Sequence, residues 1–256
     1  MSDAWNPQQY GRFRDERAQP FYDLLALVEK RSRLRAVDLG CGTGELTRVL
    51  HDQLGCRETL GLDASAAMLG KAAAYAGSGL RFEAGNIEEF APAEPYDLLF
   101  SNAALHWVAE HPQLFARLSR FVAPGGQLAV QMPANHDFAT HLIAAEVAGR
   151  EPFRSALGGY VRNSPMLSAE AYAELLHRLG FARQSVRLQV YGHVLGSRAD
   201  VVEWVKGSLL IDYEKRLSPE LFSAFLQAYR EALLPQLPAD QPYFYPFKRL
   251  LLWASR

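Results

Sequence analysis

The chain has 256 residues, of which 49% are hydrophobic and 21% charged, and its formal net charge is −1. This composition supports one sizeable core with an accessory lobe and excludes a disordered chain, and the near-neutral charge argues against a nucleic-acid footprint or an anionic membrane surface. The start has no basic region followed by an apolar core, and no apolar run approaches membrane-spanning length. The two cysteines, Cys41 and Cys56, suit a reducing cytoplasm and are too few for a metal cluster. We therefore expect a cytoplasmic protein without a metal site.

The segment before the first predicted strand, residues 5 to 28, ends in a helical pattern. Phe21, Leu24, Leu25 and Val28 recur at three- and four-residue spacing, which predicts a helix laid against the sheet. Residues 10 to 17 mix aromatic and charged side chains, a pattern typical of an amphipathic helix with a solvated face.

A glycine-rich loop follows the first predicted strand. Residues 35 to 39 are a short apolar run with the length of a buried parallel strand. Gly40, Gly42 and Gly44 come next, and a helical pattern runs from Leu46 to Leu54. Such a unit lets the backbone approach a ligand closely, and a plain tight turn is the structural alternative.

The second predicted strand, residues 58 to 62, ends in an acidic residue. Asp63 lies about twenty positions beyond the glycines, the spacing used to bind ribose hydroxyls. The glycine run is G-x-G-x-G after Asp38, whereas dinucleotide folds use G-x-G-x-x-G. A carboxylate at that point repels a pyrophosphate but accepts from an ammonium group. The pattern favours a cofactor with an amino-acid end and a positive sulfur, and disfavours a nicotinamide-dependent dehydrogenase.

These motifs resemble those of a known enzyme family. The run VDLGCGTG at residues 37–44 resembles the first motif of class I S-adenosylmethionine-dependent methyltransferases, and GLD at residues 61–63 resembles their acidic second motif. The resemblance implies an α/β fold with a Rossmann-like seven-stranded sheet. It also implies an enzyme that binds S-adenosyl-L-methionine and releases S-adenosyl-L-homocysteine.

Asn86, which follows the third predicted strand at residues 80 to 84, has two interpretations. In related methyltransferases the position of Asn86 often carries an acid that bonds the adenine amino group, and asparagine can accept that bond. A turn-forming role is equally open. Met68, on an alanine-rich helix after Asp63, could pack on adenine or simply fill the core.

Polar and aromatic residues follow the fourth predicted strand, residues 98 to 100. Ser101, Asn102, His106 and Trp107 come after its carboxyl end, where open α/β sheets bind ligands. The S-N-x-x-x-x-W form resembles the fourth methyltransferase motif of both trans-aconitate methyltransferases and malonyl-carrier-protein methyltransferases. For His106 a helix-capping role is an equal alternative.

The chain after the fifth predicted strand, residues 127 to 132, resembles the trans-aconitate enzymes. The run Q-M-P-x-N at residues 131–135 and the segment around Tyr160 and Arg162 carry this resemblance. Residues 135 to 184 are expected to form a helical insertion after the fifth strand. A sixth strand near residues 186–190, two helices and a last strand over residues 247–253 follow. His193 and Arg249 are each open to a structural or surface role as well as a substrate role.

The N-terminal segment also resembles that of the trans-aconitate family, in which it folds over the cofactor. This implies that Tyr10, Phe13 and Arg17 close the active site. We expect one methyltransferase domain over 1–256, with a lid and helix at 1–30, a cofactor-binding core at 31–134, the cap at 135–184 and the rest of the sheet at 185–256. The expected cofactor-binding residues are Arg17, Asp38, Gly40, Gly42, Gly44, Asp63, Ala64, Met68, Asn86, Ile87, Ser101 and Asn102.

The resemblance predicts a carboxyl O-methyltransferase that acts on a small organic acid like trans-aconitate. A carboxylate needs no general base, so Tyr10, His106 and Trp107 are expected to position the reactants, and Tyr160, Arg162, His193 and Arg249 to bind the acid. The family often has an arginine in the run that here reads Leu209-Leu210-Ile211-Asp212. Loss of a cation and gain of an acid there weaken binding of a tricarboxylate, which leaves a different acid open as the substrate. The alternatives are a malonyl-carrier-protein O-methyltransferase and a non-catalytic S-adenosylmethionine-binding regulator.

Overall fold

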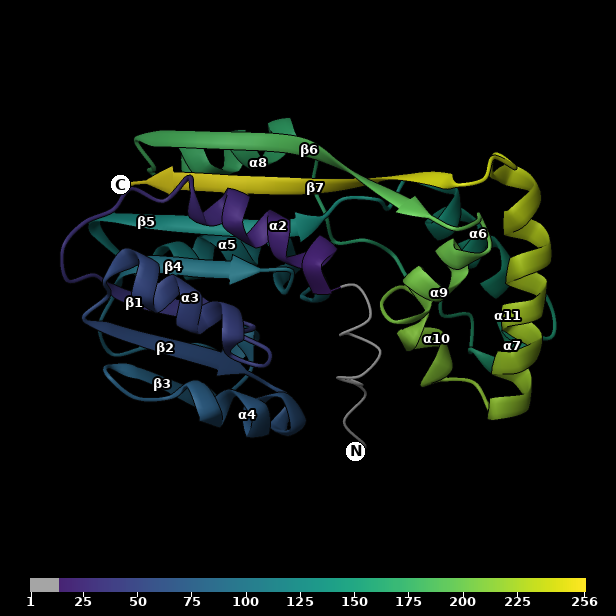
Figure 1. Cartoon of the computed structure of the whole chain (residues 1–256), viewed down its shortest axis with the longest axis horizontal. Coiled ribbons are helices and arrows are strands. Elements are labelled where there is room, and N and C mark those ends of the chain that lie inside the picture. The colour runs from purple at the N-terminus through teal and green to yellow at the C-terminus, as the bar shows by residue number, and fades with distance from the viewer. Residues whose placement is uncertain (1–13) are drawn as a thin grey trace.

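The computed structural model describes residues 14–256, with side chains from Ala18 onward. Figure 1 shows a twisted sheet flanked by helices and a helical lobe beside one end of its strands. The strands are β1 (Arg35–Leu39), β2 (Glu58–Asp63), β3 (Leu80–Ala84), β4 (Tyr96–Asn102), β5 (Val122–Pro133), β6 (Arg183–Leu195) and β7 (Tyr243–Ser255). The α-helices are α2 (Arg14–Leu25), α3 (Glu45–Leu54), α4 (Ala66–Ala72), α5 (His111–Ser119), α6 (Ala139–Ala148), α7 (Phe153–Ala156), α8 (Ala169–Arg178), α9 (Asp200–Lys206), α10 (Ile211–Glu214) and α11 (Pro219–Leu233). Short 3₁₀ turns include η3 (Ile87–Glu89) and η4 (Leu105–Trp107).

The sheet has seven strands in the order β3-β2-β1-β4-β5-β7-β6. Strands β1 to β5 run parallel, β7 runs antiparallel to β5, and β6 runs antiparallel to β7. This confirms the predicted α/β sheet. The strand order reverses between β1 and β4, and ligands of open α/β sheets bind beyond the carboxyl ends of the strands at such a point.

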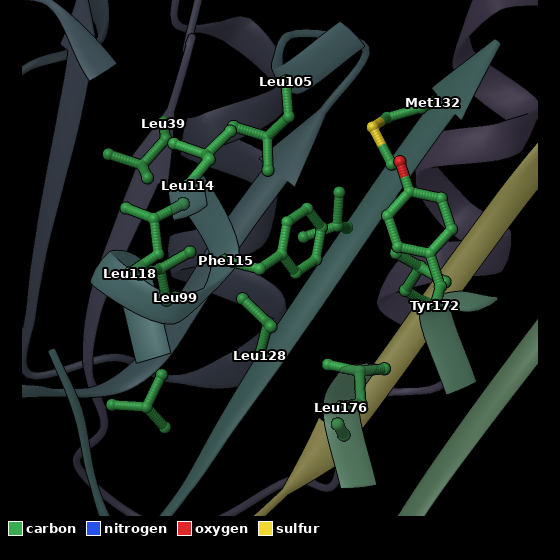
Figure 2. Close-up of a cluster of buried hydrophobic side chains, with 14 of the residues drawn as sticks. Leu39, Leu99, Leu105, Leu114, Phe115, Leu118, Leu128, Met132, Tyr172 and Leu176 are labelled. Atoms are coloured by element: carbon green, nitrogen blue, oxygen red, sulfur yellow. The ribbon is translucent and has the colours of Figure 1, made fainter. Parts of the chain in front are cut away.

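Helices cover both faces of the sheet. On one face, Phe21 and Leu24 of α2 and Leu50 of α3 pack with Phe100 and Trp253. On the other face, α5 and α8 contribute Leu114, Phe115, Tyr172 and Leu176, and Figure 2 shows this cluster against Leu99 and Leu128. Double coverage explains why the central strands read as continuous apolar runs.

A second hydrophobic core lies in the helical lobe. It joins α6 and α7 to α9, α10 and α11 and to the start of β7, with Trp204, Tyr213, Phe225, Tyr229 and Tyr245 among its buried members. The lobe is therefore built by two segments, one between β5 and β6 and one between β6 and β7. The predicted cap of residues 135–184 does not match this packing, because its helix α8 lies on the sheet against β6. Helical periodicity predicts a helix but not the surface on which it packs.

The last two strands are longer than expected. Strand β7 begins at Tyr243 rather than residue 247, and β6 pairs with it along its whole length from Arg183 to Leu195. Arg249 is buried on this strand, so its alternative as a surface residue is wrong, and Tyr243 and Tyr245 are buried there too. Their alternate spacing directs them to one face of the strand.

No helix within residues 14–256 is long and apolar enough to cross a bilayer. Over the same residues, no group of three or more histidine, cysteine or acidic side chains is arranged to hold a metal ion. Cys41 and Cys56 are buried free thiols.

Candidate active site

The glycine loop between β1 and α3 docks on the end of β2. The N–H groups of Gly40 and Cys41 both donate to the Leu62 carbonyl, at 2.8 and 3.0 Å. Gly40 has a φ of +80°, and a Cβ there would lie 2.2 Å from the Ala104 Cβ, so this position requires glycine for the turn itself. Gly42 has a φ of +57°, yet a Cβ there would meet nothing within 4 Å. The turn and the ligand interpretations are therefore compatible, because the loop is tight at Gly40 and open at Gly42.

Asp63 braces this loop. Its Oδ2 accepts from the Gly42 N–H at 2.8 Å, and its Oδ1 accepts from the Ser65 N–H at 2.9 Å. Each carboxylate oxygen has a second lone pair for a further donor. The carboxylate thus lies beside the open part of the loop, and its bond to ribose hydroxyls stays a prediction.

Asp38 is a buried carboxylate at the carboxyl end of β1. The Thr47 hydroxyl donates to its Oδ2 at 2.6 Å, while Oδ1 has no hydrogen-bond partner among the described residues. The pKa of Asp38 is raised to about 7, chiefly by burial; the Thr47 bond opposes this rise and the Asp63 charge adds to it. A buried acceptor without a donor fits the ammonium and sulfonium end of S-adenosylmethionine.

The loops after β2 and β3 hold the remaining predicted cofactor residues. Met68 is buried on α4, whose first turn is capped by Ser65, while Ala64 is exposed. Asn86 is exposed and makes no side-chain capping bond to η3. The Ile87 carbonyl accepts from Arg117 at 2.6 Å, which holds this segment near the glycine loop. Their contacts to the cofactor stay predictions.

Ser101 and Asn102 at the end of β4 differ in their partners. The Ser101 hydroxyl is fully buried and donates to the Leu39 carbonyl at 2.7 Å, which ties β4 to β1. The Asn102 Oδ1 is buried and has no partner within residues 14–256. Of the two side chains, Asn102 is the one with an acceptor available for a ligand.

His106 and Trp107 lie on η4, just beyond β4. Burial holds the pKa of His106 well below its usual range, and the positive charges of Arg162 and Arg249 lower it further. The His106 Nδ1 has no hydrogen-bond partner in the part of the chain that the structure describes. The Arg162 guanidinium lies 4.2 Å from the centre of the Trp107 ring. Two arginines from distant parts of the chain therefore come close to the turn after β4.

Arg162 and Tyr160 both contact the Asp212 carboxylate of the protein itself. The Tyr160 hydroxyl donates to the Asp212 Oδ2 at 3.4 Å, and the Arg162 Nη1 lies 3.5 Å from the same oxygen. The Arg162 Nη1 also donates to the carbonyls of Ser208 and Leu209, each at 3.2 Å. The acid that replaces the family's arginine therefore pairs with the arginine that was expected to bind substrate.

His193 and Arg249 are both buried. The His193 ring centre lies 4.6 Å from that of Trp204, inside the aromatic core of the lobe. Arg249 lies on β7, with its guanidinium 4.7 Å from the centre of the Phe247 ring. The positive charge of Arg249 is one cause of the lowered pKa of His106. His193 has the contacts of a structural residue.

Two polar residues near the site were missed from the sequence. His141 on α6 has a pKa lowered to about 4, first by burial and then by the charge of Arg162. Gln131 on β5 is fully buried, and both polar atoms of its side chain lack a partner among the described residues. Its signal in the sequence is a glutamine inside an otherwise apolar run of this strand. The predicted roles of Tyr10, Phe13 and Arg17 fall on side chains outside the described part of the structure.

Comparisons with known proteins agree with these features. A family profile described as a methyltransferase domain matches residues 10–186. A trans-aconitate 2-methyltransferase from Deinococcus radiodurans is 45% identical over 99% of this chain and 98% of its own length. The enzyme of the same name from Streptomyces avermitilis is 38% identical over 99% and 97%.

Solved structures share the fold. YcgJ from Bacillus subtilis has a TM-score of 0.61 at 16% identity over 93% of this chain and 98% of its own. An S-adenosylmethionine-dependent methyltransferase from Mesorhizobium loti has a TM-score of 0.51 at 21% identity over 92% and 96%. Together with the glycine loop, Asp38 and Asp63, the full-length relatives show that the chain belongs to the trans-aconitate 2-methyltransferase family of class I S-adenosylmethionine-dependent methyltransferases.

Proposed function

We propose that this methyltransferase transfers the methyl group to a carboxylate oxygen of a small polycarboxylic acid, with trans-aconitate as the leading candidate. The names of the full-length relatives support this acid. The observation that carries the proposal is that Arg162 lies 4.2 Å from the ring centre of Trp107, next to His106 beyond the end of β4, and that Arg249 is buried opposite Pro133 at the end of β5. Guanidinium groups bind carboxylates through paired hydrogen bonds, so this arrangement suits an acid with several carboxylates.

S-adenosylmethionine, when bound, supplies an electrophilic methyl group on a positive sulfur. Asp38 would hold its cationic amino-acid end, Asp63 its ribose hydroxyls, and the open backbone at Gly42 would admit it closely. The unpartnered Asp38 Oδ1 and the space at Gly42 support this fit.

The acceptor does not need a proton removed. Carboxylic acids have reference pKa values of about 4, so the nucleophilic oxygen is ionised at neutral pH. The O–CH₃ bond forms as the S–CH₃ bond breaks, and the products are a methyl ester and a neutral thioether. The role of the protein is then to hold the oxygen in line with the methyl group and to exclude water. A neutral His106 beside the acceptor is compatible with positioning.

The experiment is methyl transfer from radiolabelled cofactor to a panel of acceptors. The panel contains trans-aconitate, a saturated tricarboxylate, an unsaturated dicarboxylate and a malonyl-loaded carrier protein. We expect the label in trans-aconitate, and we expect mild alkali to release it as methanol because the product is an ester. Label in the carrier protein alone, or in none of the acceptors, would contradict the proposal. The comparisons give no support to the carrier-protein or regulator alternatives.

A further inference from the structure

Two glutamines on β5 differ in whether their side chains are hydrogen-bonded. Gln127 and Gln131 lie four residues apart on one strand, so their side chains share one face of the sheet. Both are fully buried, at 0% exposure. This makes Gln127 a reference for what a buried carboxamide does at this face.

Both polar atoms of the Gln127 side chain are hydrogen-bonded in the structure. Its Oε1 accepts from the Glu29 N–H and the Trp253 Nε1, both at 2.8 Å, and its Nε2 donates to the Glu29 carbonyl at 2.9 Å. These bonds tie β5 to β7 and to the segment after α2. The role of Gln127 is structural.

Gln131 has none of these partners. Neither its Oε1 nor its Nε2 makes a hydrogen bond to any described residue. Burial of a carboxamide without partners lowers the stability of the folded protein. Because a methionine would fill the same space without this loss, the amide at Gln131 calls for a partner that arrives from outside.

The neighbours of Gln131 identify the chemistry of that partner. Asn102 lies directly opposite Gln131 on β4, and its side-chain Oδ1 also has no hydrogen-bond partner among the described residues. On the other side β5 pairs with β7, with Gln131 opposite Leu251 and Pro133 opposite Arg249. Arg249 is therefore a diagonal neighbour of Gln131 on the same face. The Gln131 NH₂ group beside one guanidinium forms a set of N–H donors that suits a carboxylate, while the Asn102 Oδ1 is an acceptor.

This group also lies next to the cofactor residues. Asp38 pairs in register with Phe100 on β4, two residues before Asn102, so Asp38 and Asn102 share the sheet face that α2 and α3 cover. Gln131 lies on the same face as Asp38, with β4 alone between their strands.

We propose that Gln131, with Arg249 as its diagonal neighbour, forms the subsite that holds a carboxylate of the acceptor acid. The inference rests on the proposed function and names a binding residue for it. The Gln131 NH₂ group donates to the carboxylate, and Arg249, with five N–H donors, can bond both the carboxylate and the Gln131 Oε1. The acid thereby supplies the hydrogen bonds that the folded chain lacks.

The test compares Gln131→Met with the matched control Gln127→Met. We measure the melting temperature without ligands, KM and kcat for trans-aconitate, and the affinity for S-adenosylhomocysteine by calorimetry. For Gln131→Met we expect a melting temperature equal to or above that of the wild type, KM raised at least tenfold, and cofactor-product affinity within twofold. For Gln127→Met we expect a lower melting temperature and an unchanged KM, because Glu29 and Trp253 lose their partner.

A second variant, Gln131→Glu, should alter the pH dependence of KM, which a change in packing alone would not do. Its shape matches that of the wild type, but ionisation of the new carboxyl opposes an anionic acceptor. We therefore expect its KM to rise more steeply with pH than that of the wild type.

Two results for Gln131→Met would overturn the inference: an unchanged KM, whatever the melting temperature, or a loss confined to cofactor-product affinity. The last result would assign the amide to the cofactor. A wild-type chain that methylates no acid would remove the proposed function together with this inference. An active wild type with unaffected Gln131 variants would remove the inference alone.

Discussion

The Arg162 guanidinium lies 3.5 Å from the Asp212 carboxylate and 4.2 Å from the centre of the Trp107 ring. Arg162 lies in the segment between α7 and α8, Asp212 on α10, and Trp107 on η4. One side chain thus joins the helical lobe to the turn that follows β4. Burial lowers the pKa of the guanidinium, and the Asp212 charge opposes that effect. Asp212 therefore competes with any acidic substrate for this arginine.

The Arg162–Asp212 pair predicts KM changes of opposite sign for variants of its two residues. Arg162→Lys should raise KM for the acid about tenfold, which corresponds to ~1.4 kcal/mol, because lysine loses the planar fork. Asp212→Asn should lower KM a few-fold, since it frees the guanidinium. Steady-state kinetics with trans-aconitate measures both, and Arg230→Lys on α11 of the same lobe is the control. If Arg162 is only structural, both variants will melt earlier and keep the wild-type KM.

Asp38 predicts how cofactor binding depends on pH. Its pKa is raised to about 7, so the carboxyl is protonated below that pH in the free protein. The ammonium group of the ligand binds the ionised form, and affinity should therefore fall up to about tenfold for each pH unit below 7 and level off above it. Calorimetric titration with S-adenosylhomocysteine from pH 5.5 to 8.5 measures the profile. Asp38→Asn should weaken binding and flatten the curve; a flat curve in the wild type would refute the assignment.

The same shift has a consequence for stability. The folded-state pKa of Asp38 lies above its ordinary value of 3.8, so the folded protein without ligand binds this proton more readily than the unfolded chain. The contribution of Asp38 to the free energy of unfolding therefore rises as the pH falls from about 7 toward 4. Asp38→Asn, which keeps an acceptor for Thr47, should melt at a higher temperature than the wild type at pH 8. Thermal melts at pH 5 and pH 8 check the sign.

Asp63 is expected to hold the ribose hydroxyls and also braces the loop at Gly42 and Ser65. Asp63→Ala should weaken binding of S-adenosylhomocysteine by ~1.5–3 kcal/mol, the range for a hydrogen bond to a charged acceptor. Glu83→Ala, which removes an exposed acid on neighbouring β3, is the control and should bind as the wild type does. Equal calorimetric affinities for Asp63→Ala and the wild type would exclude the ribose role.

His106 should not act as a general base. Burial and the two arginines keep its pKa well below the usual range, so the ring is neutral over the working pH, and the carboxylate acceptor has no proton to lose. We expect kcat at saturating substrates to be flat from pH 6 to 9. His106→Gln should reduce kcat by less than about tenfold, whereas general bases contribute about 10²–10⁴-fold. A larger loss together with an acid limb in the wild-type profile would show that His106 takes a proton.

Local patterns in the sequence determined the cofactor half of the fold. Strand β1 has the predicted bounds, β2 extends one residue further to include Asp63, and the glycines form the turn between β1 and α3. These features depend on residues close together in the chain: a short apolar run, a helical spacing and a loop that needs positive φ. The family resemblance also followed from these neighbouring residues.

Only the tertiary structure decided the acceptor half. The lobe combines two segments separated by β6, and the bond between Arg162 and Asp212 joins residues fifty positions apart. The unequal roles of Gln127 and Gln131 depend on whether Glu29 and Trp253 come within bonding distance, and both lie about a hundred residues or more from Gln127. Periodicity shows which face of a strand or helix is apolar, but the partner of that face is determined by long-range packing, which a local pattern does not specify.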